Sequence, residues 1–223
     1  MESWNEKGRR LNTLIRPTTF PVAVKLYKSA SDFPDKVRRP KEHLGIKIPV
    51  CQGLSMARMY GWTVGMTGED SINCAGRIVF GWRTPNDEEN LMNGWVQAGF
   101  MKNTTAAKKT LDSIYKFQEG EYEGLVMSPL ERTKIEPDLI MVYCNPAQII
   151  PLTHSTLYKS GGRQVFSSQS AVASCSDGIV QTILKREPSV VLPGIGDRTI
   201  AMTRDDELIF AIPAIMLDDV LAG

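Results

Sequence analysis

Residues 49–76, with the sequence PVCQGLSMARMYGWTVGMTGEDSINCAG, combine a predicted helix, an acidic turn and two thiols. Apolar positions in the first half predict a short, largely buried helix over 51–60, and Gly61 suits the left-handed residue that ends many helices. Cys51 would begin this helix, and Cys74 follows the acidic turn. Unpaired N–H groups and the positive end of the helix dipole favour a thiolate at a helix start. The segment therefore predicts a metal-binding or nucleophilic thiol, although no CxxC motif identifies its occupant.

Helical and strand patterns alternate along the rest of the chain. Apolar residues at helical spacing predict helices over 4–14, 86–98, 104–117, 147–158, 169–186 and 213–221. Apolar, β-favouring runs predict strands over 20–27, 122–127, 139–143, 189–192 and 207–212, and a brief strand at 165–166. Residues 78–82 fit a strand or a buried helix, 31–49 a loop, 128–134 a one-turn helix or loop, and 193–197 a tight turn. Strands scattered among helices favour a mixed α/β or α+β fold.

The 223 residues could form one large domain or two small ones. No stretch has the Pro/Gly/Ser composition of a flexible linker, so we expect a single compact domain over residues 1–223. Limited proteolysis should cut the charged loop 31–47 before it releases any folded half. Two stable fragments divided near Gly120 would contradict this expectation.

Composition and charge exclude several classes of protein. Hydrophobic residues at 42% and charged residues at 23% are typical of a soluble globular protein, and the net charge of +1 argues against nucleic-acid binding. No apolar run approaches the roughly 20 residues of a membrane span. The polar amino terminus lacks the apolar core of a signal peptide, so we expect a cytoplasmic protein. In that reducing compartment, four scattered cysteines predict free thiols, metal ligands or redox-active thiols rather than disulfides.

A set of short motifs extends over most of the chain: Cys51-Gln52 with Ala57-Arg58, Gly68-Glu69-Asp70 with Cys74, Ser128-Pro129-Leu130-Glu131, Glu136-Pro137-Asp138, Asn145-Pro146-Ala147-Gln148, the Cys175 segment, Gly196-Asp197-Arg198 and Asp205-Asp206-Glu207. With this set, the chain resembles the prokaryotic domain-of-unknown-function family one-sixty-nine, also called the ArCR group. The resemblance implies a protein of archaea or anaerobic bacteria, without a settled activity. It also implies that the thiols matching Cys51, Cys74 and Cys175 recur in the family, whereas a thiol at Cys144 is optional.

These observations lead to a first functional hypothesis, a cytoplasmic iron–sulfur or other soft-metal protein with a redox or cofactor-handling role. Cys51, Cys74 and Cys175 would hold the metal, and a four-iron, four-sulfide cluster bound by three thiolates would keep one iron open for a small ligand. Conventional clusters have four cysteine ligands, so Cys144 is the rival fourth ligand. Zinc is a less favoured metal than iron for this site, and buried thiols without any metal are the simplest alternative.

The second hypothesis is a metal-free small-molecule-binding or regulatory protein, in which the thiols are buried packing and Arg58, Arg77 or Arg198 binds an anion. Arg58 lies seven residues after Cys51, almost two helical turns, and would line the same cavity; a surface salt bridge explains it equally well. Cysteine-nucleophile catalysis would need a histidine base, and neither His43 nor His154 is fixed near a thiol by the sequence. The sequence therefore leaves open whether the protein is an enzyme, whether its partner is a small molecule or a redox protein, and whether it forms a homo-oligomer.

Overall fold

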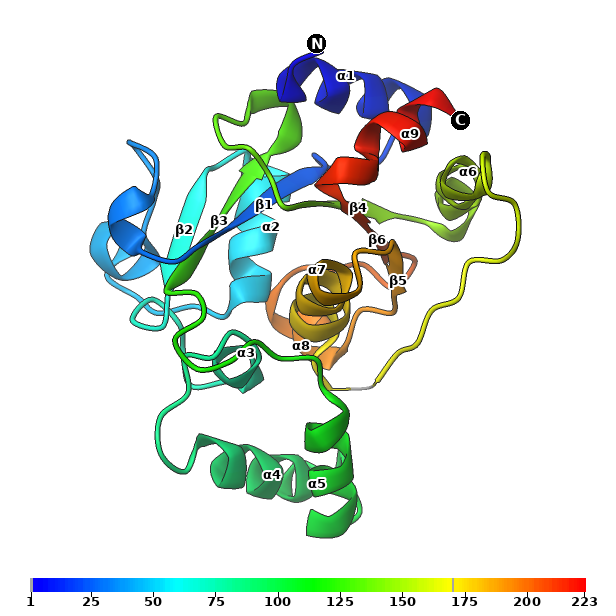
Figure 1. Cartoon of the computed structure of the whole chain (residues 1–223). Coiled ribbons are helices and arrows are strands. Elements are labelled where there is room, and N and C mark those ends of the chain that lie inside the picture. Colours follow the sequence, from blue (N-terminus) through cyan, green and yellow to red (C-terminus); the bar gives the residue numbers. More distant parts are fainter. Residues whose placement is uncertain (1, 170) are drawn as a thin grey trace.

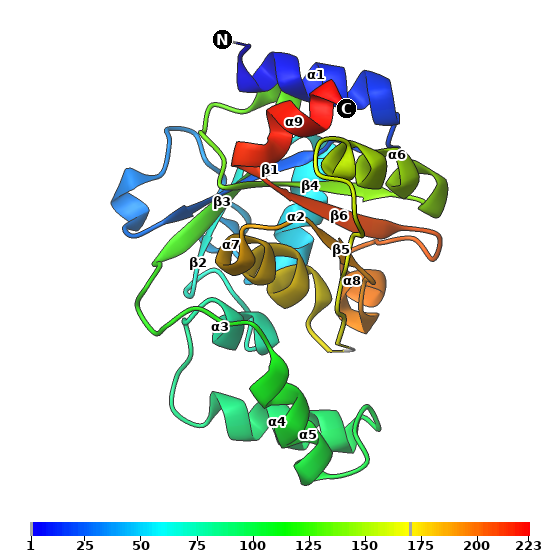
Figure 2. The ribbon, with the colours of Figure 1, turned by 45° about the vertical axis from the view of Figure 1, so that its right-hand side comes forward.

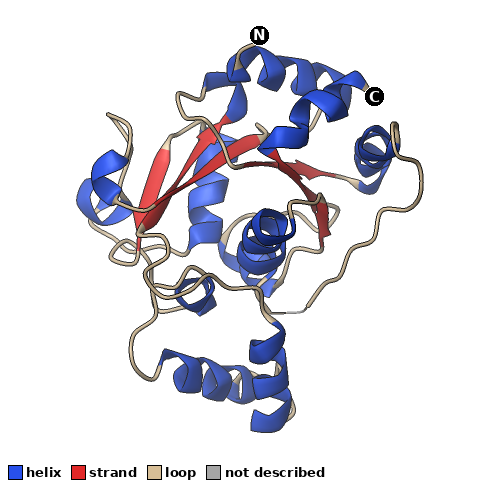
Figure 3. Ribbon diagram, in the orientation of Figure 1, coloured by secondary structure: helices blue, strands red, loops and turns tan. Residues whose placement is uncertain are grey.

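The computed structural model describes residues 2–169 and 171–223, and its centre is a six-stranded antiparallel sheet. The strand order is β2-β3-β1-β4-β6-β5 (Figures 1 and 3). The strands are β1 (Val22–Tyr27), β2 (Val64–Thr67), β3 (Gly124–Pro129), β4 (Leu139–Cys144), β5 (Ser189–Val191) and β6 (Leu208–Pro213). The sheet joins strands from the first and last parts of the chain, because β4 pairs with both β1 and β6. The mixed α/β class predicted from the sequence is confirmed.

Helices cover both faces of the sheet (Figure 2). The longer helices are α1 (Trp4–Ile15), α2 (Val50–Tyr60), α4 (Asp87–Gln97), α5 (Thr104–Ser113) and α6 (Pro146–Leu157). The shorter ones are α3 (Ala75–Val79), α7 (Gln181–Lys185), α8 (Ile195–Ile200) and α9 (Leu217–Ala222). Single turns of other helix types are η1 (Ala30–Asp32), η2 (Pro40–Leu44), η3 (Leu130–Arg132) and η5 (Ala214–Met216), and a longer π-helical segment is η4 (Ala173–Val180).

Two apolar cores lie on opposite faces of the sheet. On β4, Leu139, Met141 and Tyr143 belong to the core that includes α2 and η4, whereas Ile140, Val142 and Cys144 belong to the core that includes α1, α6 and α9. This division follows from strand geometry, since successive side chains point to opposite faces. All six residues of β4 are buried, as expected for a strand covered on both sides.

Helices α4 and α5 pack against each other and extend away from the sheet beyond α3 (Figures 1 and 2). Buried Trp95 of α4 and Leu111 of α5 belong to the same core as α2. This pair of helices therefore extends one core rather than forming a separate one.

Most of the predicted elements lie where the sequence places them, and the exceptions have physical causes. The predicted helix 169–186 is instead η4 followed by α7, and residue 170 of that prediction lies outside the described residues. The predicted strand at 165–166 is absent from the described residues, and Val165 and Phe166 lie in an exposed connection. The tight turn predicted at 193–197 leads into α8, and the ambiguous segment 78–82 contains the end of α3. Strand β2 was missed because its four residues are all buried and show no polar alternation.

The loop predicted over 31–49 contains η1 and η2, and its ends are tied to the rest of the fold. Arg38 forms an isolated parallel bridge with Val64, and Ile48 forms another with Ser71. No helix in the described ranges is both long enough and apolar enough to cross a membrane.

Candidate functional site

Three thiols from distant parts of the chain line one cavity. Cys51 lies in the first turn of α2, Cys74 is the residue before α3, and Cys175 lies in η4. A Cβ added at Gly76 would lie 3.4 Å from the Sγ of Cys74 and 3.7 Å from the Sγ of Cys175, so both sulfurs reach the same point. The cavity has a volume of about 100 Å³. This is smaller than the roughly 300–1,000 Å³ of typical organic-ligand pockets.

Backbone pairing brings the first two thiols together. The Ile48 N–H donates to the Asp70 carbonyl at 2.9 Å, and the Ile72 N–H donates to the Ile48 carbonyl at 3.3 Å. The segments that lead to Cys51 and Cys74 therefore run side by side, and each enters a helix within three residues of this contact. The turn before Cys74 is held by the buried Asp70 carboxylate, which accepts hydrogen bonds from the Arg39 side chain at 2.6 and 2.8 Å.

The third thiol comes from an irregular helix. All eight residues of η4 are buried, and η4 packs on β5 and β6 on the face of the sheet that α2 also covers. At Gly178 an added Cβ would lie 2.9 Å from the Cε of Met141, so glycine permits this close approach to β4. π-Helical turns are rare in proteins, and those that occur are frequently at functional sites, which agrees with a functional role for η4.

An aspartate that was not among the predicted site residues, Asp197 of the Gly196-Asp197-Arg198 motif, also lines the cavity. Asp197, in the first turn of α8, accepts a hydrogen bond from the Ser174 hydroxyl at 2.5 Å and another from the Gly194 N–H at 3.0 Å. Burial raises the pKa of the Asp197 carboxyl. Asp197 could have been recognised from the sequence as a polar side chain at the third position of a helix whose preceding residue is a glycine.

The environment of the thiols contradicts the expected thiolate at Cys51. Burial raises the pKa of Cys51 well above its ordinary value, and the nearby negative charge of Asp197 raises it further. Hydrogen bonds from the backbone at the helix start lower this pKa, but burial outweighs them. Burial also raises the pKa of Cys74 and Cys175. Without a bound cation these groups are therefore neutral thiols at pH 7.

The fourth thiol lies on the other side of the sheet. Cys144, at the end of β4, packs in the core of α1, α6 and α9, and its Sγ is 3.6 Å from the Val142 carbonyl oxygen. Burial raises its pKa to about 12. The structure thus groups Cys51, Cys74 and Cys175 and leaves Cys144 apart from them, separated by the thickness of the sheet.

The three candidate anion-binding arginines are occupied by other groups. Arg58 is fully buried, and its guanidinium donates to the Glu207 carboxylate at 2.9 and 3.1 Å. Arg77 donates to the carbonyls of Gly68 and Trp82 at 2.8 and 2.9 Å, which braces the chain on both sides of α3.

Arg198 donates to the Arg204 carbonyl and lies 3.5 Å from the Asp205 carboxylate. Among the described residues that line the thiol cavity there is no arginine. Contrary to the prediction, Arg58 does not line this cavity, because its side chain turns toward Glu207 and the ring of Tyr143.

In the described parts of the chain, no group of three or more His, Cys, Asp or Glu side chains is arranged around the position of a single metal ion. The cavity thus assembles thiols and one carboxylate as a lining without forming the compact ligand set of a closed mononuclear site.

The fold and the cavity define a mixed α/β protein in which a thiol-lined pocket lies between α2, α3, η4 and α8. The chain belongs to the uncharacterised ArCR family, the domain-of-unknown-function family one-sixty-nine, whose sequence profile matches residues 10–223. An uncharacterized protein of Methanocaldococcus jannaschii is 28% identical to it over 220 residues, covering 97% of this chain and 91% of that protein. No solved structure matches the chain significantly.

Proposed function

We propose that the protein holds an iron–sulfur cluster through Cys51, Cys74 and Cys175, and that it acts in the cytoplasm in a redox or cofactor-handling role. The observation that carries the proposal is the meeting of these three thiols at one cavity, although 124 residues separate the first from the last. Buried thiols brought together from three elements supply the soft ligands that iron–sulfur clusters and zinc prefer.

The arrangement favours a cluster over a single ion. Thiolates around a cluster bind different iron atoms, so they need not converge on one point as the ligands of a single ion must. The cavity volume of about 100 Å³ suits a small inorganic group better than an organic metabolite. Three thiolates would hold three irons of a four-iron cluster and leave the fourth open to a small molecule.

Binding would be linked to proton release. Each neutral thiol must lose its proton to become a ligand, so loading the site with three thiolates releases three protons. A cation would also offset the negative charge of Asp197 beside Cys51. When bound, a cluster of this type supplies one-electron chemistry or an open coordination position.

The alternative of an anion site at Arg58, Arg77 or Arg198 finds less support. The guanidinium groups of all three donate to carboxylates or carbonyls of the protein itself. Buried thiols without metal remain the competing explanation, and the test below separates it from the proposal.

The test is to purify the protein without oxygen, and to measure iron, acid-labile sulfide, zinc and visible absorbance. Single Cys→Ser variants at positions 51, 74 and 175 are compared with Cys144→Ser, the matched control of a buried thiol on the opposite face. We expect iron and sulfide in the wild type and in Cys144→Ser, and their loss in the other three variants. A colourless wild type without iron or zinc would reject the proposal, and zinc without sulfide would replace the cluster by a zinc site.

A further inference from the structure

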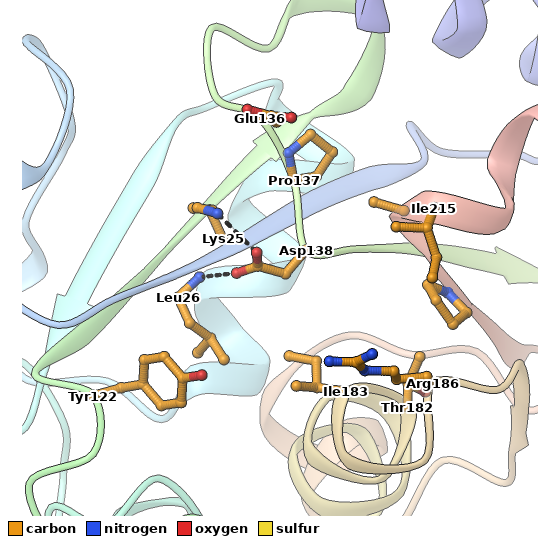
Figure 4. Close-up of a pocket in the computed structure, with 12 residues that line it drawn as sticks. Lys25, Leu26, Tyr122, Glu136, Pro137, Asp138, Thr182, Ile183, Arg186 and Ile215 are labelled. Atoms are coloured by element: carbon orange, nitrogen blue, oxygen red, sulfur yellow. Dashed lines mark hydrogen bonds and ion pairs between the residues drawn. The ribbon is translucent and has the colours of Figure 1, made fainter.

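A second and larger cavity lies outside the thiol site, where the end of α7 faces the edge of β1 and the start of β4 (Figure 4). Its volume is about 430 Å³, within the range of roughly 300–1,000 Å³ that is typical of small-molecule sites. The thiol cavity and this one share no lining residue.

One side of this cavity is formed by an ion pair that the fold holds firmly. The Lys25 ammonium lies 2.8 Å from the Asp138 carboxylate, and the other oxygen of Asp138 accepts a hydrogen bond from the Leu26 N–H at 2.7 Å (Figure 4). Because Asp138 neutralises Lys25, this pair adds no net charge to the cavity.

The opposite side carries an exposed arginine, Arg186, to which the described residues supply no side-chain partner. Figure 4 shows the guanidinium of Arg186 extending from the end of α7 into the space below Asp138, and no interaction joins it to the other residues drawn. The described residues contain no side-chain hydrogen bond or salt bridge to Arg186. A guanidinium has five donors and keeps its charge at all physiological pH values, so it is suited to bind a carboxylate with two parallel hydrogen bonds.

The backbone at Arg186 has a conformation that favours glycine. Its φ is 54° and its ψ is 34°, the left-handed region, at the residue that ends α7. For an arginine this conformation costs on the order of 1 kcal/mol. A glycine at this position would end the helix with less strain.

The wall of the cavity also includes a threonine whose hydroxyl is buried, Thr182. Thr182 lines the cavity one turn before Arg186, is fully buried, and its Oγ1 has no hydrogen-bond partner among the described residues. The oxygen is closed to solvent, so a ligand in the cavity would contact it only after the Thr182 side chain rotates about χ1. Ile183 and Ile215 form apolar parts of the wall, and the side chain of Ile215 is 79% exposed.

We propose that this cavity binds a small organic acid with a single carboxylate and an apolar body. The carboxylate would pair with Arg186, and the body would cover Ile183 and Ile215. The four charged side chains of the lining, Lys25, Glu136, Asp138 and Arg186, sum to zero, so Arg186 can pair with one negative charge and no further positive charge is left for a second. Lys25 is already neutralised, and Glu136 at the rim would repel a more highly charged group such as phosphate.

The test is isothermal titration of the full chain with isovalerate, benzoate, acetate, isovaleramide and inorganic phosphate. We expect saturable binding of isovalerate or benzoate, weaker binding of acetate because it lacks an apolar body, and none of the neutral amide. Arg186→Gly should weaken carboxylate binding more than about tenfold, the loss expected for a hydrogen-bonded charge pair. It should also leave the melting temperature equal or higher, because glycine relieves the left-handed backbone.

The matched control is Arg16→Gly, because Arg16 also ends a helix in the left-handed region, with a φ of 52°, and lies outside the cavity lining. It should leave the melting temperature equal or higher in the same way and leave carboxylate binding unchanged. Absence of saturable binding by every carboxylate would overturn the proposal. Equal binding of isovaleramide, equal binding of phosphate, or unchanged affinity in Arg186→Gly would do the same.

Discussion

Substitutions in the buried ion pair between Arg58 and Glu207 would measure how much this pair contributes to the free energy of unfolding. Arg58 has no exposed surface, and the side chain of Glu207 is 3% exposed. Glu207 also accepts a hydrogen bond from the Arg204 N–H at 2.9 Å, and the guanidinium of Arg58 lies 4.1 Å from the centre of the Tyr143 ring. The substitution Glu207→Gln removes the negative charge and leaves the arginine charge buried without its counter-ion.

The expected loss is large because the remaining charge cannot reach water. Removal of one partner of a buried pair typically destabilises a protein by about 3–5 kcal/mol. For a chain of this size, each kcal/mol lowers the melting temperature by roughly 2–4 °C, so a fall on the order of 10 °C is expected. The double variant Arg58→Met, Glu207→Gln removes both charges and should lose less stability than the sum of the two single variants.

Urea unfolding followed by circular dichroism measures the four proteins of this cycle, with the slope compared between variants to check two-state behaviour. The exposed pair Arg204–Asp206 supplies a control, since the ion pair is screened by solvent and Asp206→Asn should leave the free energy of unfolding almost unchanged. A loss below about 1 kcal/mol for Glu207→Gln, or strictly additive effects in the cycle, would refute the assignment of Arg58 to a structural role. Stability unchanged with a loss of anion binding would restore the anion-site hypothesis.

Two further predictions test the turn before Cys74 and the packing of α1. Burial raises the pKa of Asp70, but hydrogen bonds from Arg39 and the backbone outweigh it and lower the pKa below its ordinary value. The stability that Asp70 contributes is therefore complete above its unfolded pKa and disappears as the pH falls through the folded pKa. Asp70→Asn should weaken this dependence of the unfolding free energy on pH, as measured by urea unfolding at several acidic pH values. The same pH dependence in the variant and the wild type would contradict the assignment. Gly8→Ala should destabilise the protein by about 1–3 kcal/mol, because the new Cβ would lie 2.6 Å from a backbone nitrogen of η3. Gly94→Ala, in an open position of α4, should instead stabilise it by about 0.5–1 kcal/mol, and thermal unfolding of both variants measures the contrast.

Local sequence patterns were sufficient for the long elements. Helices α1 and α6 begin at capping boxes formed by Ser3 with Glu6 and by Asn145 with Gln148, so their starts could be predicted from side chains that satisfy nearby backbone groups. Strands β4 and β6 were equally clear, because each is a continuous apolar run that begins directly after an acidic residue, Asp138 or Glu207. The π-helical character of η4 could not be predicted, because a helix with one extra residue per turn has no distinct apolar pattern.

Burial decided the chemistry of the candidate site in ways that the sequence could not show. The helix start at Cys51 was predicted correctly, but the effect of the helix dipole on the thiol was not, because removal of water from the thiolate outweighs a few backbone donors. Arg58 likewise lies on α2 as expected, but its partner Glu207 is 149 residues further along the chain and meets it only when the segment between α8 and β6 folds against α2.

The amino-acid sequence by itself determined which residues form the long helices and strands, and that the described chain has no apolar helix of membrane-spanning length. It also identified the four thiols as the residues with the most distinctive chemistry. Only the tertiary structure decided which thiols meet. Cys144 occupies a position of β4 that faces α6, whereas α2, α3 and η4 bring the other three to the opposite face. The physical reason is that alternation along a strand sorts side chains by face, while the contact between distant segments depends on how the whole sheet is assembled.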